Sequence, residues 1–212
     1  KDFLEIVDRF RLKERFPSSV VSLIQDESGL PEMPAGVAIS SHYLLMDNRV
    51  ALARAASLIP EGCVAEIAEE LVEGDVEEMA RVHLQRLRFL AESNPGKLVC
   101  LLSGGEVICP VRGDGLGGRN QEFVLRAAIN AEGWKAFAIL SAGTDGIDGV
   151  SPAAGAVADG STVERGTELG LDAGDYLARS DSYSYFAKLG DSVITGPTGN
   201  NVRDLRILLM QG

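Results

Sequence analysis

The glycine-rich stretch that ends at Arg119 is the strongest candidate for chemistry in this sequence. Gly117 and Gly118 precede the arginine, and Asn120 follows it where a helix is expected to begin. An asparagine at that point caps the helix, whose free N–H groups carry partial positive charge, and the guanidinium adds a full charge beside them. This combination predicts a site for a carboxylate or a phosphoryl group. The alternative is a surface arginine beside a glycine turn.

Residues 113–118 also match the pattern G-x-G-x-x-G, which binds the pyrophosphate of a dinucleotide when it joins a strand to a helix. That fingerprint needs an acidic residue about 20 positions later, at the end of the next strand. Glu132 falls at the end of the expected helix, and Asp145 falls in another glycine-rich loop. The pattern is therefore weak evidence for a dinucleotide site.

A second pair of glycines follows the apolar run at residues 97–102. Gly104 and Gly105 expose consecutive backbone N–H groups that can cradle an anion, and Ser103 and Glu106 place polar groups at the rim. The alternative for these four residues is a tight turn between two strands.

Two carboxylates, Asp145 and Asp148, stand three positions apart in a glycine-rich loop that follows Thr144. Such a pair can hold a hard cation or orient a hydroxyl group. An EF-hand is excluded, because Ile147 and Gly149 stand where that loop needs oxygen ligands. Asp-Gly pairs are also ordinary turn formers, which is the alternative interpretation.

The last polar loop covers residues 195–204. Its hydroxyl, amide and backbone donors suit a small polar ligand, and they come from Thr195, Gly196, Thr198, Asn200 and Asn201. Asp204 at the end of the loop is placed to orient neighbouring asparagine or arginine side chains. The spacing alone does not name the ligand.

These loops need a scaffold, and the apolar patterns predict an α/β layer structure in which functional groups gather at the carboxyl ends of strands. We expect a mixed, largely parallel sheet flanked by helices. Asp75 and Glu78 form a capping box at the start of one helix. The expected strands or apolar runs lie near residues 36–46, 63–72, 97–102, 106–111, 136–141, 191–195 and 205–210, and the expected helices near residues 48–58, 75–90, 120–131, 161–169 and 173–188.

The N-terminal part has a different character. Residues 2–27 predict two short helices that break between Phe16 and Pro17, and residues 28–34 contain two prolines and a glycine, which exclude regular structure. We expect residues 1–35 to be the tail and linker of a preceding domain, and residues 36–212 to form the α/β domain.

The 212 residues carry a net charge of −11 and no Lys/Arg-rich stripe, which argues against nucleic acid and anionic membranes as partners. No apolar stretch approaches the ~20 residues that cross a bilayer. The 3 cysteines have no metal-ligand spacing, which predicts reduced thiols in a cytoplasmic protein. His83 lies between Met79 and Leu87 on the face of a helix and is expected at the edge of the core. No nucleophile elbow or Walker A sequence is present.

Four motifs in order resemble the C-terminal MOFRL region of the glycerate 2-kinase family, at residues 117–122, 143–149, 181–183 and 195–205. The fourth motif departs from the usual Thr-Asn-Val by reading Gly-Asn-Asn-Val from Gly199. The resemblance implies transfer of the γ-phosphoryl group of ATP, with Mg²⁺, to the 2-hydroxyl of D-glycerate in a cleft between two α/β domains.

The resemblance also implies roles for single residues. Arg119 matches the family's catalytic arginine, and Asp145 and Asp148 become candidates for the metal. The candidates for binding substrate or nucleotide are Ser103, Gly104, Gly105, Glu106, Gly117, Gly118, Asn120, Glu122, Thr144, Asp181, Thr195, Gly196, Thr198, Asn200 and Asn201.

The family's N-terminal domain, with its own glycine-rich loop and a lysine that acts together with the arginine, is missing from this sequence. We therefore expect part of a glycerate kinase, inactive without that domain, with glycerate and the missing domain as partners. The oligomeric state stays open, a homodimer included. Two other classes also stay open: an NAD(P)-dependent hydroxypyruvate reductase, and a non-catalytic domain that binds small anions.

Overall fold

The computed structural model describes residues 2–25, 43, 45–70 and 73–212, and the chain divides into two units, residues 1–43 and 44–212. The first unit contains α1 (Asp2–Arg9), the 3₁₀ helix η1 (Leu12–Arg15) and α2 (Ser18–Gln25). The predicted break is confirmed, because Phe16 is extended and α2 begins after Pro17. The predicted linker at residues 28–34 and most of the apolar run at 36–46 lie outside the described residues.

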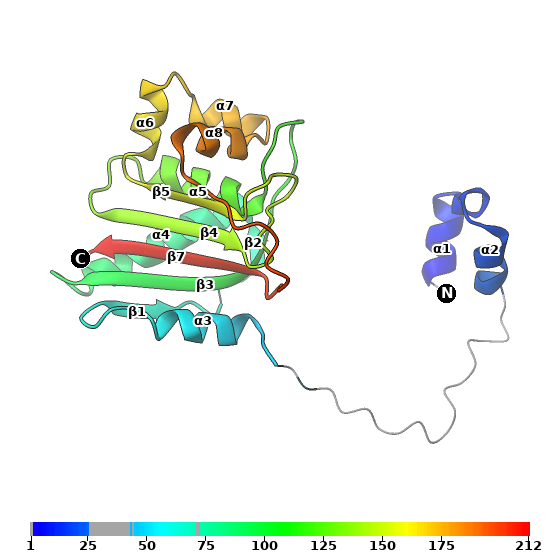
Figure 1. Ribbon diagram of the computed structural model, residues 1–212, viewed down its shortest axis with the longest axis horizontal. Helices are drawn as coiled ribbons and strands as arrows, with labels where there is room; N and C mark the ends of the chain where they lie inside the picture. Colours follow the sequence, from blue (N-terminus) through cyan, green and yellow to red (C-terminus); the bar gives the residue numbers. More distant parts are fainter. Residues whose placement is uncertain (1, 26–42, 44, 71–72) are drawn as a thin grey trace. The chain divides into compact units, whose positions relative to one another are not determined.

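The second unit is built on a seven-stranded sheet in the order β1-β3-β7-β4-β5-β6, with β2 also paired to β3 (Figure 1). The strands are β1 (Val64–Ile67), β2 (Glu73–Asp75), β3 (Leu98–Ile108), β4 (Phe137–Gly143), β5 (Gly155–Asp159), β6 (Ser192–Val193) and β7 (Asp204–Gln211). The pairings of β3 with β1 and β2 are parallel. All the others are antiparallel, so the expectation of a largely parallel sheet is wrong.

The error comes from the last strand and from one hairpin. β3 and β4 run in the same direction, as the β-α-β rhythm predicts, but β7 inserts between them antiparallel to both. β4 also pairs antiparallel with β5, which lies in residues expected to continue a glycine-rich loop. Local periodicity predicts a crossover between two strands, but it does not tell where a C-terminal strand inserts.

Helices cover both faces of the sheet. α4 (Val76–Glu92) and α5 (Arg119–Asn130) pack on one face, and α3 (Asn48–Ala56) packs on β1, β3 and β7 (Figure 1). α6 (Thr162–Glu168), α7 (Ala173–Ala178) and α8 (Ser182–Leu189) adjoin α5. The expected single helix at residues 173–188 is wrong, because Ser180 adopts φ 56° and interrupts it. None of the helices in the described part is long and apolar enough to cross a membrane.

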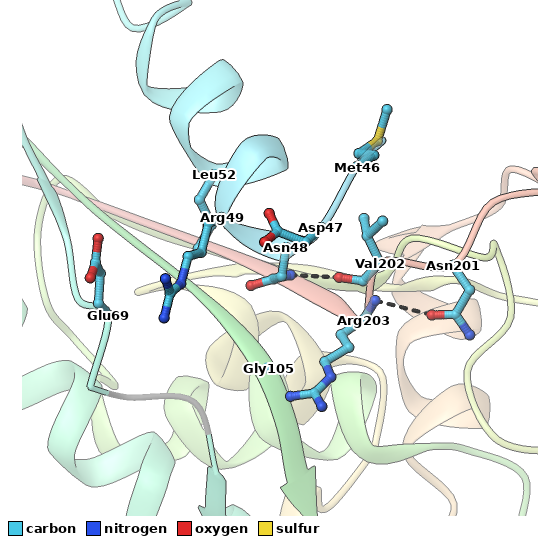
Figure 2. Close-up of a pocket in the computed structure, with 10 residues that line it drawn as sticks. All are labelled: Met46, Asp47, Asn48, Arg49, Leu52, Glu69, Gly105, Asn201, Val202 and Arg203. Carbon is cyan, nitrogen blue, oxygen red and sulfur yellow. Dashed lines mark hydrogen bonds between the residues drawn. The ribbon is translucent and has the colours of Figure 1, made fainter. Parts of the chain in front are cut away.

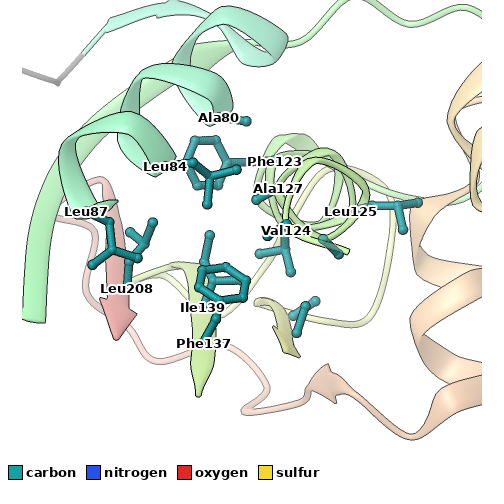
Figure 3. Close-up of a cluster of buried hydrophobic side chains, with 14 of the residues drawn as sticks. Ala80, Leu84, Leu87, Phe123, Val124, Leu125, Ala127, Phe137, Ile139 and Leu208 are labelled. Atoms are coloured by element: carbon teal, nitrogen blue, oxygen red, sulfur yellow. The ribbon is translucent and has the colours of Figure 1, made fainter. Parts of the chain in front are cut away.

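The core explains the continuous apolar run in β3. Val99 and Leu101 belong to the cluster with α4 and α5, whereas Cys100 and Leu102 belong to a second cluster with Leu52 of α3. Both faces of the strand are thus buried, which favours an unbroken apolar sequence over an alternating one. Figure 3 shows the larger cluster, in which helix and strand side chains interdigitate: Leu84, Leu87, Phe123, Ile139 and Leu208.

The state of the cysteines and the N-cap of α4 agree with what the sequence predicts. All three thiols are free, with Cys100 buried and Cys63 and Cys109 half-buried. The carboxylate of Asp75 accepts hydrogen bonds from the backbone N–H groups of Glu77 and Glu78 at the start of α4. An acidic cap at this point also complements the helix dipole.

His83 is fully buried, deeper than the place at the edge of the core that was expected. Its Nδ1 lies 2.7 Å from the carbonyl oxygen of Met79, and its Nε2 lies 2.7 Å from the hydroxyl of Ser103. A carbonyl only accepts, so Nδ1 carries the proton and Nε2 accepts from Ser103. Burial, together with the positive charge of Arg206, lowers the pKa of His83 to about 4.

We expect this histidine to make the fold acid-sensitive. The pKa is 6.5 for an ordinary histidine and about 4 in the folded protein, so protons bind the unfolded chain preferentially between these values. About 3 kcal/mol of unfolding free energy is then lost as pH falls through this window. His83→Gln can donate to Met79 and accept from Ser103 without titrating, so it should lose about 3 kcal/mol less. Urea unfolding at pH 7 and pH 4 measures both; equal losses would contradict the assignment.

Candidate active site

The candidate site lies at the end of the sheet where β7 begins. Asp204, the first residue of β7, pairs in register with Gly105 of β3 and Gly143 of β4. Neither neighbour has a side chain, so the space beside the Asp204 carboxylate is left to groups from other elements. Arg119, the first residue of α5, fills part of that space.

The Arg119 guanidinium is fixed by two carboxylates. Its Nε and Nη2 donate to the two oxygens of Asp204 at 2.8 and 2.9 Å, and Nη2 also donates to Glu106 at 3.0 Å. Nη1 has no hydrogen-bond partner among the described residues, and 37% of the side chain is exposed. The bond to Asp204 raises the pKa of Arg119, so the group stays cationic and presents one free N–H-bearing nitrogen.

A second arginine holds Asp204 from inside the protein. Arg206 lies two residues along β7, on the same face as Asp204, and both are completely buried. Its Nη2 donates to Asp204 at 3.2 Å, its Nη1 donates to the Gly104 carbonyl at 2.6 Å, and its guanidinium lies over the Phe123 ring. Burial lowers the pKa of Arg206 to about 10, which still leaves it charged at neutral pH. The Asp204 carboxylate is therefore held between two cations.

The glycine-rich loop at residues 113–118 borders a hollow of about 580 Å³, which Arg119 and Glu122 also line. Packing accounts for several of its glycines. A Cβ on Gly118 would collide with Asp148, and one on Gly117 would collide with the Ser182 hydroxyl. One side of the loop therefore packs closely against Asp148 and Ser182, and the other side lines the hollow.

The predicted cap of α5 is wrong. Gly118, not Asn120, is the N-cap residue, and the carboxylate that satisfies the helix start comes from Asp148 in a distant loop. One oxygen accepts from the Asn120 backbone N–H at 3.0 Å, and the other accepts from the Gln121 backbone N–H at 2.9 Å. Both amide side chains donate to it as well. Free N–H groups at a buried helix start need acceptors, and this carboxylate supplies them in place of a ligand.

This placement changes the interpretation of Asp148. The side chain is 2% exposed, and burial raises its pKa, although four hydrogen bonds from α5 favour the charged form. Both oxygens are committed, so Asp148 does not fit as a metal ligand. Asp145 keeps more freedom, because within the described residues one of its oxygens accepts, from the Ile147 backbone N–H at 3.1 Å, and the other has no hydrogen-bond partner.

Residues 103–106 form neither a ligand-binding loop nor a tight turn. They lie inside β3, which continues from the first expected strand into the second. Ser103 is buried against His83, so its predicted place at a rim is wrong. Gly104 lies against the Asn48 side chain, and a Cβ there would collide with it. Only Glu106 has the predicted polar position, through its bond to Arg119.

The loops at residues 144–149 and 195–203 are joined, as a shared site requires. The Thr144 hydroxyl accepts from the Val202 backbone N–H at 2.9 Å and donates to the Arg203 carbonyl at 2.6 Å. Thr198 donates to the Thr144 carbonyl at 2.6 Å. Gly199, where the motif departs from its usual form, has φ 75°, a conformation that glycine adopts without strain.

Most of the other predicted binding residues make hydrogen bonds within the protein. The Thr195 hydroxyl donates to the Gly196 carbonyl, and the Asn200 backbone N–H donates to the Thr198 hydroxyl. Asn201 accepts from the Arg203 backbone N–H. Asp181 precedes α8 and accepts from the Leu116 backbone N–H at 3.0 Å, which pins the glycine-rich loop.

A second hollow, of about 490 Å³, lies where α3 meets residues 201–203 and Gly105 (Figure 2). It shares no lining residue with the hollow beside the glycine-rich loop. Arg119 lines the first hollow, and Arg203, the residue before Asp204, lines the second.

No group of three or more His, Cys, Asp or Glu side chains that could hold a metal occurs in the described part of the chain. Mg²⁺ in phosphoryl-transfer sites is commonly bound by one or two carboxylates together with substrate phosphates. Asp145 fits that requirement, and Asp148 does not.

Sequence reasoning underestimated the side chains behind Arg119. The interpretation that Asp204 orients an arginine is confirmed, but its buried partner Arg206 was missed. A signal was present: Asp204 and Arg206 are charged residues two apart at the start of a strand that continues with four apolar residues, which places both charges on one face of the strand.

Fold and site together define an α/β domain that presents a fixed, permanently charged guanidinium at the edge of a hollow. The chain belongs to the MOFRL family, whose profile matches residues 99–204. The predicted resemblance to this family is confirmed.

Among its relatives, the D-glycerate 2-kinase of Thermotoga maritima is 49% identical over 114 residues, which are 54% of this chain and 27% of the relative. A putative hydroxypyruvate reductase of Agrobacterium vitis is 33% identical over 99% of this chain and 48% of its own length. The crystal structure of glycerate kinase from Thermotoga maritima aligns with a TM-score of 0.68 and 38% identity, covering 76% of this chain and 39% of that one. The chain thus spans less than half of these relatives.

Proposed function

We propose that this chain is the C-terminal part of a glycerate kinase that transfers the γ-phosphoryl group of ATP to the 2-hydroxyl of D-glycerate. The observation that carries the proposal is the fixed fork of Arg119, whose free Nη1 faces away from the two carboxylates that hold the other nitrogens. Relatives named as glycerate kinases support the substrate assignment. On this proposal the chain needs the rest of the enzyme for turnover, because one domain cannot close a cleft around the reactants.

The role of Arg119 follows from its geometry. Phosphoryl transfer develops charge on the oxygens of the moving group, and a preorganised cation beside them lowers the barrier without reorganising. Asp204 fixes the plane of the guanidinium with two hydrogen bonds, and Glu106 fixes its far end. The uncommitted Nη1 is then the donor that contacts the transferred phosphoryl group.

Asp145 is the carboxylate that would hold Mg²⁺ in this proposal, and the bound ion would neutralise phosphate oxygens of ATP. Asp145→Asn removes the charge but keeps an oxygen for the Ile147 N–H. We expect the Mg²⁺ concentration for half-maximal rate to rise about 10-fold. A Mg²⁺ titration of the rate measures this, with Asp175→Asn in the exposed start of α7 as the matched control. An unaltered titration would mean that Asp145 stabilises the turn and does not bind Mg²⁺.

The test of the proposed function is product analysis with the full-length enzyme. Incubation with ATP, Mg²⁺ and D-glycerate should yield 2-phosphoglycerate, identified by ³¹P NMR, and this chain alone should yield none. Formation of another phosphoglycerate, or no ATP consumption by the full-length enzyme, would overturn the proposal.

A reductase is the competing function, and the sheet order argues against it. A dinucleotide fold places the strand after the glycine-rich helix directly beside the strand before it. Here β7 separates β3 from β4. Oxidation of NADH or NADPH with hydroxypyruvate, followed at 340 nm, should therefore be undetectable. Glycerate binding without turnover by the full-length enzyme would instead support the non-catalytic class.

A further inference from the structure

The hollow between α3 and the start of β7 contains two arginines that the proposed function has not used. Arg49 and Arg203 both line it, and in Figure 2 the Arg49 side chain extends on the side of Glu69 and the Arg203 side chain on the side of Gly105. Gly105 precedes Glu106, and Arg203 precedes Asp204; these two carboxylates hold Arg119. Two residues that line the hollow, Gly105 and Arg203, thus directly precede the two carboxylates that hold Arg119.

Arg203 is held in a conformation that arginine rarely adopts. Its φ is 71°, in the left-handed region. Thr144 donates to its carbonyl from both the backbone N–H (3.1 Å) and the hydroxyl (2.6 Å), and the Arg203 N–H donates to Asn201 at 3.0 Å. Such strain persists only where the surroundings impose it, and it concentrates at ligand sites.

The Arg203 guanidinium itself is nearly uncommitted. Its ion pair within the described residues is with Glu73, at 3.8 Å, and the two side chains are 54% and 72% exposed. An exposed pair at that distance contributes little and is easily exchanged for a ligand. The backbone of Arg203 is therefore fixed while its charged end is available.

Arg49 is brought to the same hollow by a separate anchor. Asn48, at the start of α3, donates from its side-chain amide to the carbonyls of Val202 (2.7 Å) and Asp204 (3.0 Å). This bond ties α3 to the segment that carries Arg203. Arg49 follows in the first turn and has no ion-pair partner within the described part of the chain.

Two carboxylates share the hollow with these cations. Asp47 is committed to the cap of α3, because it accepts from the Val50 backbone N–H at 2.9 Å. Glu69 is exposed and lies beyond Arg49 in Figure 2. The hollow thus contains two guanidinium groups that are not committed to close ion pairs within the described residues, in a chain whose net charge is −11.

We propose that Arg203 and Arg49 bind the carboxylate of the small 2-hydroxy acid, so that its hydroxyl points toward Arg119. The inference rests on the proposed function and assigns the acceptor to this hollow. A planar guanidinium matches a carboxylate with two parallel hydrogen bonds. Transfer needs donor and acceptor on either side of the moving group, and the two carboxylates that hold Arg119 each directly follow a residue that lines this hollow.

The nucleotide belongs in the other hollow. Four glycines of residues 113–118 line it, and Val111 and Val150 supply apolar surface for a base. The lining of this hollow includes one arginine, Arg119, whereas the hollow beside α3 includes two, Arg49 and Arg203.

The experiment compares Michaelis constants in the full-length enzyme. Arg203→Asn keeps a residue that tolerates a left-handed backbone, and Arg49→Gln removes the other cation from a different element. Each should raise the KM for D-glycerate at least about 10-fold, while the KM for ATP stays within about 3-fold. Arg88→Gln, on the exposed face of α4, is the matched control. Circular dichroism verifies that each variant folds.

The outcomes separate this inference from the proposed function. An increase confined to the KM for ATP, or no change in either constant for both variants, overturns the subsite and leaves the kinase intact. If the wild-type enzyme phosphorylates nothing, the proposed function fails, and titration of this chain with D-glycerate by NMR decides the subsite. Binding that is lost in Arg203→Asn supports it, and equal binding or none overturns it.

Discussion

Arg119→Lys should lower the kcat of the full-length enzyme about 10³-fold while the protein stays folded. Lysine keeps the charge, but its single nitrogen cannot bond both oxygens of Asp204, reach Glu106 and still present a donor to the phosphoryl group. The lost stabilisation is specific to the transition state, so kcat falls more than the KM for either substrate rises. Steady-state kinetics with D-glycerate and ATP measure the effect.

The control for this variant is Arg88→Lys, a conservative change of the same type on the outer face of α4. It should leave kcat within about 2-fold, because exposed substitutions away from special features have small effects. A wild-type rate in Arg119→Lys would remove the guanidinium from the mechanism, whatever its contacts in the free protein.

Local sequence signals predicted several elements of the α/β domain, but not β5, the break between α7 and α8, or the arrangement of the strands. The α4 capping residue Asp75 and the apolar β3 run reflect interactions within a few positions of the chain. The insertion of β7 between β3 and β4 depends on contacts more than 60 residues apart, such as those of Arg206 and Leu208 with the layer beneath α5. No local pattern encodes that choice, and the sheet was therefore expected to be more parallel than it is.

The site shows the same limit at the scale of single side chains. The glycines and the arginine near residue 119 predict an anion site, because the charge of an arginine and the exposed backbone of a glycine do not depend on partners elsewhere in the fold. The assignments of Ser103, Asn120 and Asp148 failed because each depends on a partner from another element: His83, the Asp148 carboxylate and the start of α5. A buried polar group takes whichever partner the fold supplies, and the sequence does not reveal that partner in advance.

Asp204→Asn should be the most destabilising single change at the site. The carboxylate balances Arg206, and both side chains are 0% exposed, so its neutralisation leaves a buried cation with only the Gly104 carbonyl as a strong partner. Removing one member of a buried pair costs about 3 kcal/mol. The same change frees Arg119 from its two-point anchor, so kcat should fall at least about 10²-fold as well.

Stability and catalysis can be separated by a second substitution. Arg206→Met replaces the buried guanidinium over Phe123 with an apolar side chain that adapts to the same space. In Asp204→Asn combined with Arg206→Met, no unpaired charge remains buried, so the unfolding free energy should recover to within about 1 kcal/mol of wild type. The rate should stay low, because nothing restores the fork of Arg119. Urea unfolding and steady-state kinetics on both variants measure the two effects. We expect a double variant that is stable but slow, because the buried pair orients Arg119. Recovery of the rate together with stability would mean that Asp204 serves the fold alone.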